Sequence, residues 1–95
     1  MKIDSSISGR WVTAEEDSDV ELTIEFSDGV PTVLAHCRSD GEKLDVQDLR
    51  IEGDTLCFET IVPSTGYRAR SRMRFLDMES CEMELTLRER WKRIE

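Results

Sequence analysis

Four arginines occupy every second position of one short segment, at Arg68, Arg70, Arg72 and Arg74. Alternate side chains of a β-strand share one face, so these four guanidinium groups are expected to form a row. Arginine binds carboxylates and phosphates through paired hydrogen bonds, which makes the row a candidate docking surface for a partner. A solvated face of weak cross-strand ion pairs is the simpler alternative, and the predicted pairs are Arg74 with Glu82, Arg72 with Glu84 and Arg70 with Glu59.

The basic character continues toward the end of the chain. Pairing of the arginine segment with the next predicted strand places Arg68 opposite Arg88, and like charges that face each other destabilise a sheet. We therefore expect a basic patch here that a protein partner or a second copy covers. The predicted interaction patch consists of Arg68, Arg70, Arg88, Arg90 and Trp91.

His36 is the only histidine, and the strand pattern puts it on an outer face between Glu21 and Asp45. Such a row is a conceivable set of metal ligands. Three ligands on a flat sheet face rarely converge on one ion, so we expect surface ion pairs and no metal site.

Catalytic signatures are missing from the sequence, which has no P-loop, nucleophile elbow or HExxH motif. One acid–base pair is conceivable, because Glu89 falls on the inward face near Tyr67. We expect Glu89 to lie in water at the barrel mouth. The chain is therefore not expected to be an enzyme or to hold a cofactor, and catalysis in the barrel interior stays a distant alternative.

Alternation of apolar and polar residues predicts the strands that position these groups. It runs without a fault through residues 19–26, 67–75 and 81–88. Turn signals separate the runs at residues 28–29, 40–41, 53–54 and 63–66. The sequence predicts an all-β fold of seven antiparallel strands in up-and-down order, with a short eighth strand as an alternative.

The turns imply a register that keeps one face apolar, with Ile24 opposite Val33 and Leu56 opposite Met73. A two-residue turn at 40–41 places Cys37 opposite Leu44. The alternation slips after residue 46, and a β-bulge near residues 47–48 restores it. A long sheet with one apolar face must curl to bury it, so we expect a barrel or a half-barrel. Seven strands leave the first and last parallel, and an open ring has edges that tend to pair.

The inward face is the candidate ligand site. Large side chains tend to fill a short barrel, so a packed interior is expected, with a small apolar ligand as the alternative. The residues predicted to line a ligand site are Trp11, Leu22, Phe26, Phe58, Tyr67, Met73, Met83 and Leu85.

Gly9-Arg10-Trp11 on the first predicted strand resembles the G-x-W signature of the lipocalins and their calycin relatives. In that superfamily a basic residue of the last strand packs over the tryptophan, and the resemblance gives this place to Arg88 or Arg90. The chain is much shorter than a typical lipocalin. The resemblance therefore implies a lipocalin-like barrel or half-barrel more firmly than it implies ligand transport.

Composition predicts one domain over residues 1–95. The net charge of −8 makes nucleic-acid binding unexpected. No apolar run reaches the roughly 20 residues of a membrane helix, and no secretory signal is recognised at the start. Three cysteines without CxxC spacing predict reduced thiols in a cytoplasmic protein, namely Cys37, Cys57 and Cys81.

Charge is unevenly distributed along this acidic chain. Residues 1–60 carry 5 basic and 15 acidic side chains, and residues 61–95 carry 8 basic and 6 acidic ones. Opposite halves of two copies would attract each other. We expect a non-enzymatic domain that acts in protein interaction or self-association, as a homodimer or other homo-oligomer, with a carrier of a small hydrophobic ligand as the alternative.

Overall fold

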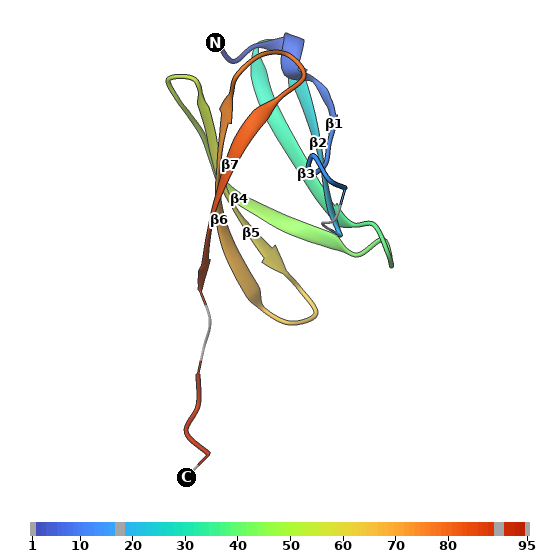
Figure 1. The fold of residues 1–95 in the computed structure, drawn as a ribbon, viewed down its shortest axis with the longest axis vertical. Helices are drawn as coiled ribbons and strands as arrows, with labels where there is room; N and C mark the ends of the chain where they lie inside the picture. Colours follow the sequence, from blue (N-terminus) through green and yellow to red (C-terminus); the bar gives the residue numbers. More distant parts are fainter. Residues whose placement is uncertain (1, 17–18, 89–90, 95) are drawn as a thin grey trace.

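The computed structural model describes residues 2–16, 19–88 and 91–94, and these form a seven-stranded antiparallel sheet whose strands pair in sequence order. The sheet curls into a half-barrel (Figure 1), which confirms the predicted meander. A 3₁₀ helix, η1 (Ser5–Ile7), precedes the strands. The strands are β1 (Gly9–Trp11), β2 (Val20–Ser27), β3 (Val30–Cys37), β4 (Lys43–Glu52), β5 (Thr55–Val62), β6 (Tyr67–Phe75) and β7 (Cys81–Arg88).

Strand β4 joins two wings of the half-barrel. It pairs with β3 through Ala35 opposite Leu44 and His36 opposite Lys43, and it pairs with β5 from Asp45 onward. One wing therefore contains β1 to β3 and the other β5 to β7, and Figure 1 shows them diverging from β4. β1 and β7 end the strand order, so the side between them is open.

The predicted β-bulge is present in β4. The register shifts between Gln47 and Arg50, and Asp48 has a φ of 55°. Such a left-handed residue lets the bulged strand bend. Leu49, which lies within this shifted stretch, packs against the core, so the apolar alternation is restored as expected.

The predicted register between β3 and β4 is wrong by two residues. Ala35 lies opposite Leu44, where a two-residue turn would have placed Cys37. The Gly41 amide donates to the Cys37 carbonyl and the Cys37 amide donates to the Glu42 carbonyl, each at 2.8 Å, so the loop is wider than such a turn. A slip of two residues keeps every side chain on its face, so the apolar pattern did not reveal it.

The other registers that build the inner face are confirmed. Ile24 lies opposite Val33, and Met73 lies opposite Leu56 on one side and Met83 on the other. Each strand therefore turns its apolar side chains toward the same concave face.

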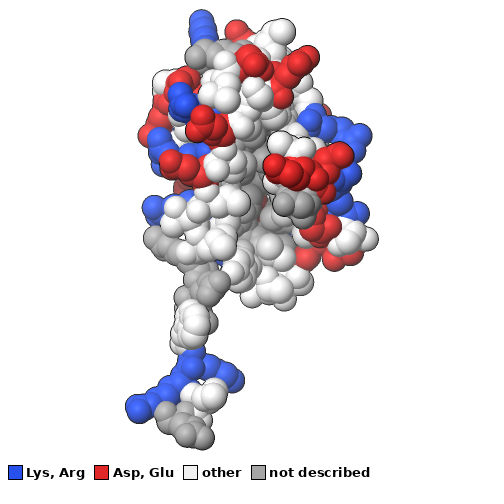
Figure 2. Space-filling model, in the orientation of Figure 1, with Lys and Arg blue, Asp and Glu red and all other residues white. Residues whose placement is uncertain are grey.

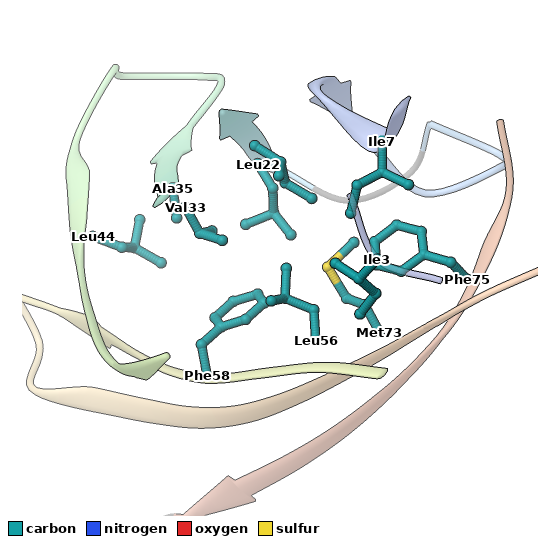
Figure 3. Packing of buried hydrophobic residues seen from close by; sticks show 11 residues of the cluster. Ile3, Ile7, Leu22, Val33, Ala35, Leu44, Leu56, Phe58, Met73 and Phe75 are labelled. Atoms are coloured by element: carbon teal, nitrogen blue, oxygen red, sulfur yellow. The ribbon is translucent and has the colours of Figure 1, made fainter. Parts of the chain in front are cut away.

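The apolar core lies between the two wings (Figure 3). Leu22, Val33 and Ala35 of one wing point toward Leu56 and Phe58 of the other, and all five are buried. Full burial of a large apolar side chain contributes about 1.5–3 kcal/mol. These contacts hold together two wings that share few backbone hydrogen bonds.

The segment before β1 closes one end of this core. Ile3 and Ile7 are buried there near Phe75 (Figure 3). The Asp4 carboxylate caps η1 by accepting a hydrogen bond from the Ser6 amide at 2.9 Å. This closure was not predicted from the sequence. Two isolated apolar residues, four positions apart around an Asp cap, were the available signal.

Candidate functional site

An open groove of about 480 Å³ lies between the connector after β1 and strands β6 and β7. Small-molecule sites have volumes of about 300–1,000 Å³, so the groove has the size of a binding site. The packed interior expected from the sequence accounts for only part of the inner face. The apolar lining includes Trp11, Val20, Leu22, Leu44, Val62, Tyr67, Ala69, Met73, Cys81, Met83, Leu85 and Leu87.

The structure separates the predicted ligand-site residues into two groups. Phe58 does not line the groove because it is buried in the core, and Phe26 packs against that core with partial exposure. Alternation identifies the inward face but cannot tell a core position from a groove position. The predicted residues that do line the groove are Trp11, Leu22, Tyr67, Met73, Met83 and Leu85.

The inner face of β7 stays largely open to solvent beside the groove. Met83, Leu85 and Leu87 are 39%, 59% and 54% exposed. β7 ends the strand order, so its outer edge has no strand neighbour within the described chain. Natural edge strands are protected by Pro, Lys, bulges or short length, but β7 has eight residues, no Pro, no Lys and a regular register with β6. The opposite edge, β1, has three residues.

Trp11 stands between the core and the groove. Its Nε1–H donates to the Ile7 carbonyl at 2.9 Å, and its ring meets the edge of Phe75. The resemblance placed Arg88 or Arg90 over this tryptophan. The side chain of Arg88 and the whole of Arg90 lie outside what the structure describes, so that expectation stays a prediction.

The three predicted ion pairs along β6 can be compared directly with the structure. The pair between Arg74 and Glu82 is confirmed at 3.1 Å. Glu59 lies opposite Arg70 in the register, yet its carboxylate pairs with Arg68 at 2.8 Å. The predicted Arg70 pair is therefore wrong, because a long arginine side chain reaches the diagonal neighbour.

Arg72 also departs from the prediction, since it pairs with Glu52 at 3.4 Å instead of with Glu84. Arg50 binds the same Glu52 carboxylate, and its hydrogen bond lowers the pKa of Glu52. Below them lies the buried thiol of Cys57, whose pKa burial raises. A hollow of about 270 Å³ lies above this thiol and is lined by both acidic and basic side chains. These include Asp48, Arg50, Glu59, Arg70 and Arg72.

The predicted interaction patch is described only in part. Arg68 lies opposite Arg88 as predicted, but Arg68 already holds the Glu59 carboxylate. Arg70 has no ion pair among the described residues. Trp91 is 88% exposed on the segment of residues 91–94, which projects away from the body (Figure 1).

His36 belongs to a cluster around a buried carboxylate on the outer face of the first wing. Glu21 is 4% exposed and accepts hydrogen bonds from Nε and Nη2 of Arg10 at 2.9 and 2.8 Å. His36 Nε2 lies 3.7 Å and Arg38 Nε 4.0 Å from the same carboxylate. The hydrogen bond from Arg10 lowers the pKa of Glu21, so the carboxylate stays ionised and ties β1 to β2.

Glu21 lies opposite His36 as predicted, but the predicted position of Asp45 on the other side of His36 is wrong because of the β3–β4 register. Lys43 lies opposite His36, and Asp45 lies opposite Ile61 on β5. Within the described ranges, no three His, Cys, Asp or Glu side chains gather in a way that would hold a metal ion.

The cysteine thiols do not have the lowered pKa of a reactive nucleophile. The three cysteines are free, and burial raises the pKa of each thiol, so they stay protonated at neutral pH. Tyr67 is 41% exposed, and its predicted partner Glu89 lies outside the described residues.

No helix in the described part of the chain is long and apolar enough to cross a membrane. Comparison with protein-family models, with curated proteins and with solved structures found no match to this chain. The proposal for its function therefore depends on the geometry of the groove and of β7.

Proposed function

We propose that this domain is a protein-interaction module that binds an extended apolar segment at the open side of its half-barrel. The observation that carries the proposal is that β7 combines an unpaired backbone edge with an exposed apolar face beside the groove. An added strand gains affinity from backbone hydrogen bonds and specificity from alternate side chains that enter pockets. The row of Met83, Leu85 and Leu87 next to the groove suits such side chains.

The polar groups of the groove support an apolar occupant. Its buried polar lining residues are Thr60 and Ser71. No fully buried side-chain polar atom in the described ranges lacks a hydrogen-bond partner. A polar ligand would therefore lose its hydration without finding an unsatisfied buried hydrogen-bonding group. An apolar side chain gains free energy from burial.

The groove volume favours a second candidate, a carrier of a small apolar molecule. A volume of about 480 Å³ is enough for such a ligand. A lipocalin-like relationship, suggested by Gly9-Arg10-Trp11 and compatible with the half-barrel, would support this candidate. The large exposure of Leu85 and Leu87 favours the first candidate, because a small ligand in the groove would leave much of β7 uncovered.

Both candidates are binding functions and not catalytic ones. The raised pKa of the Cys37, Cys57 and Cys81 thiols supports this choice, because a reactive cysteine needs a lowered pKa. We propose a reducing compartment such as the cytoplasm, where free thiols persist.

A peptide-display selection against the immobilised domain tests the proposal. The domain is kept dilute so that contacts between copies do not compete. We expect enriched linear peptides to carry apolar residues at alternate positions and to protect the β7 amides from hydrogen exchange. Leu85→Lys on the inner face is expected to abolish the enrichment. Leu34→Lys, on an exposed position of β3, is the matched control and is expected to keep it.

The alternative outcomes decide between the candidates. Equal peptide binding by Leu85→Lys and the wild type would contradict the proposed site. Binding of a fluorescent fatty acid such as parinaric acid, without enrichment of any peptide, would favour the carrier.

A further inference from the structure

We infer that β7 pairs with β7 of a second copy of this chain, antiparallel about a two-fold axis at Thr86. This inference rests on the proposed function, because it names the occupant of the same open edge. Pairing of this kind would join two seven-stranded half-barrels into one continuous sheet. Three features of β7 support it: its charge pattern, the absence of an ion pair to Glu84 among the described residues, and its apolar face.

The outward-facing residues of β7 have opposite charges on the two sides of Thr86. Glu84 precedes Thr86 by two positions and Arg88 follows it by two positions. In the inferred pairing, each Glu84 lies opposite Arg88 of the other copy, so both contacts are attractive. The sequence extends the pattern by one step on each side, with Glu82 and Arg90.

A two-fold axis at another residue of β7 would also keep the apolar side chains of the two copies on one face. These other registers place the charged residues less favourably. An axis at Glu84 would place the two glutamates opposite each other, and an axis at Arg88 would do the same for the two arginines. An axis at Leu85 or Leu87 would place a charged residue of each copy opposite Thr86. Among these registers, the Thr86 axis alone matches both Glu84 and Arg88 with opposite charges.

The contacts among the described side chains of one copy leave the charge of Glu84 available. Arg88 lies opposite Arg68 on β6, and Arg68 already holds the Glu59 carboxylate. Glu84 lies opposite Arg72, but that arginine pairs with Glu52, and no ion pair of the described residues includes Glu84. A second β7 supplies the opposite charge to both Glu84 and Arg88.

The inward face of the inferred pairing is apolar. Leu85 of each copy lies opposite Leu87 of the other, so the two most exposed residues of the row cover each other. Cross-strand apolar pairs of this kind stabilise antiparallel sheets. Strand β7 contains no Pro, no Lys and no bulge that would keep a second strand away from its edge.

The segment after β7 also suits a second copy better than its own groove. Residues 91–94 project away from the body (Figure 1), and Trp91 on this segment is 88% exposed. In the inferred register, Trp91 lies opposite Cys81 of the other copy, which lines that copy's groove. Basic side chains stand on this segment (Figure 2), and residues 1–60 of the other copy are strongly acidic.

A cysteine on the two-fold axis tests the register. Thr86→Cys would bring two thiols together across the axis, because directly opposite Cα atoms of antiparallel strands lie about 4.5–5.5 Å apart, within the range of about 4.4–6.8 Å that a disulfide needs. We expect disulfide-linked dimers to form at least tenfold faster than in the matched control Glu82→Cys, which has no cysteine opposite. The wild type measures the background from its own thiols. Equal rates in the two variants would overturn the inferred register.

A charge exchange tests the same pairing without new thiols. By sedimentation equilibrium we expect the wild type at 22.0 kDa, twice the chain mass of 11.0 kDa. Glu84→Arg alone and Arg88→Glu alone would each replace two attractive contacts with two repulsive ones and weaken self-association at least tenfold. An equimolar mixture of the two variants restores attraction at both contacts and is expected to form a heterodimer. Glu25→Arg is the control, because Glu25 lies on β2, far from β7 in the strand order, and we expect it to leave self-association unchanged.

A wild type that sediments as a monomer at its highest soluble concentration, or a mixture that stays monomeric, would overturn the inference. Peptide enrichment by such a monomer would leave the proposed function standing and remove only the second copy as its partner. Loss of both results would overturn both proposals.

Discussion

Trp11 meets Phe75 edge to face, with ring centroids 5.2 Å apart and ring planes inclined by 78°. Trp11 belongs to β1 in one wing, and Phe75 ends β6 in the other. The strand order separates β1 from β6, so side-chain contacts and not strand pairing close this end of the half-barrel. Ile7 completes the closure, because its carbonyl accepts the Trp11 hydrogen bond at 2.9 Å.

Removal of one ring of this pair is expected to destabilise the whole domain. Phe75→Ala would leave a cavity where a fully buried ring packs, and the expected loss in the free energy of unfolding is about 3–5 kcal/mol. Urea denaturation followed by circular dichroism measures it. Leu34→Ala, on an exposed position, is the control and is expected to change stability by no more than about 0.5 kcal/mol. Equal losses in the two variants would show that the ring contact does not close the structure.

The backbone conformation at position 9 is predicted to require a glycine. Its φ is +138°, and no atom lies within 4 Å of the place where a Cβ would stand. Gly9→Ala therefore creates backbone strain without a clash, and we expect a loss of about 1–3 kcal/mol in urea denaturation. Ser8→Ala, at an ordinary φ of −60°, is the neighbouring control. A Gly9→Ala protein as stable as Ser8→Ala would contradict this explanation.

Acid is predicted to weaken the contact between Arg10 and Glu21. The hydrogen bond from Arg10 lowers the pKa of Glu21 below its ordinary value of 4.5. A carboxyl group whose pKa is lower in the folded state than in the unfolded state stabilises the fold at pH values above the unfolded-state pKa. This stabilisation is lost as the pH falls through the folded-state pKa. We expect the wild type to exceed Glu21→Gln in urea midpoint at pH 7, and the gap to narrow below about pH 4.5.

Arg10→Gln removes the same contact from its other side and is expected to show the same narrowing. A gap between wild type and Glu21→Gln that stays constant down to pH 2 would contradict the assignment.

Filling the groove is predicted to separate binding from folding. Ala69 lines the groove, and Ala69→Trp would occupy much of its volume. We expect this variant to bind a fluorescent apolar probe at least tenfold more weakly, which corresponds to about 1.4 kcal/mol, while its circular dichroism is unchanged. Arg70→Trp places the same ring on the outer face and is expected to bind the probe like the wild type. Unchanged probe binding by Ala69→Trp would place the binding site elsewhere.

Local patterns were sufficient to predict much of the fold. Alternation gave the face of each strand, and turn residues gave most of the pairings, as the match of Leu56 with Met73 shows. The register of β3 with β4 was missed, because a wide loop and a two-residue turn place the same residues on the same face. That error moved Lys43 into the position predicted for Asp45 and removed the expected ligand row.

The candidate site was only partly predictable for a related reason. Met83 and Leu85 were assigned to the ligand site from their inward parity, and they line the groove. Phe58 is also on the inward face of its strand but lies in the core. The face on which a residue lies follows from its position along one strand, whereas the distance between the two facing wings depends on contacts between residues far apart in the sequence.

The strands, their order, their apolar faces and the bulge in β4 follow from alternation and turn chemistry within short segments, so they could be predicted from the sequence. Where the apolar face is packed and where it stays open depends on tertiary contacts. Ile7 reaches Phe75 across the curled sheet and closes one end, while no described segment covers Leu85 and Leu87 on the edge strand. One end of the apolar face is covered and the other is exposed because the two wings diverge at β4. The alternation of apolar and polar residues does not predict this divergence.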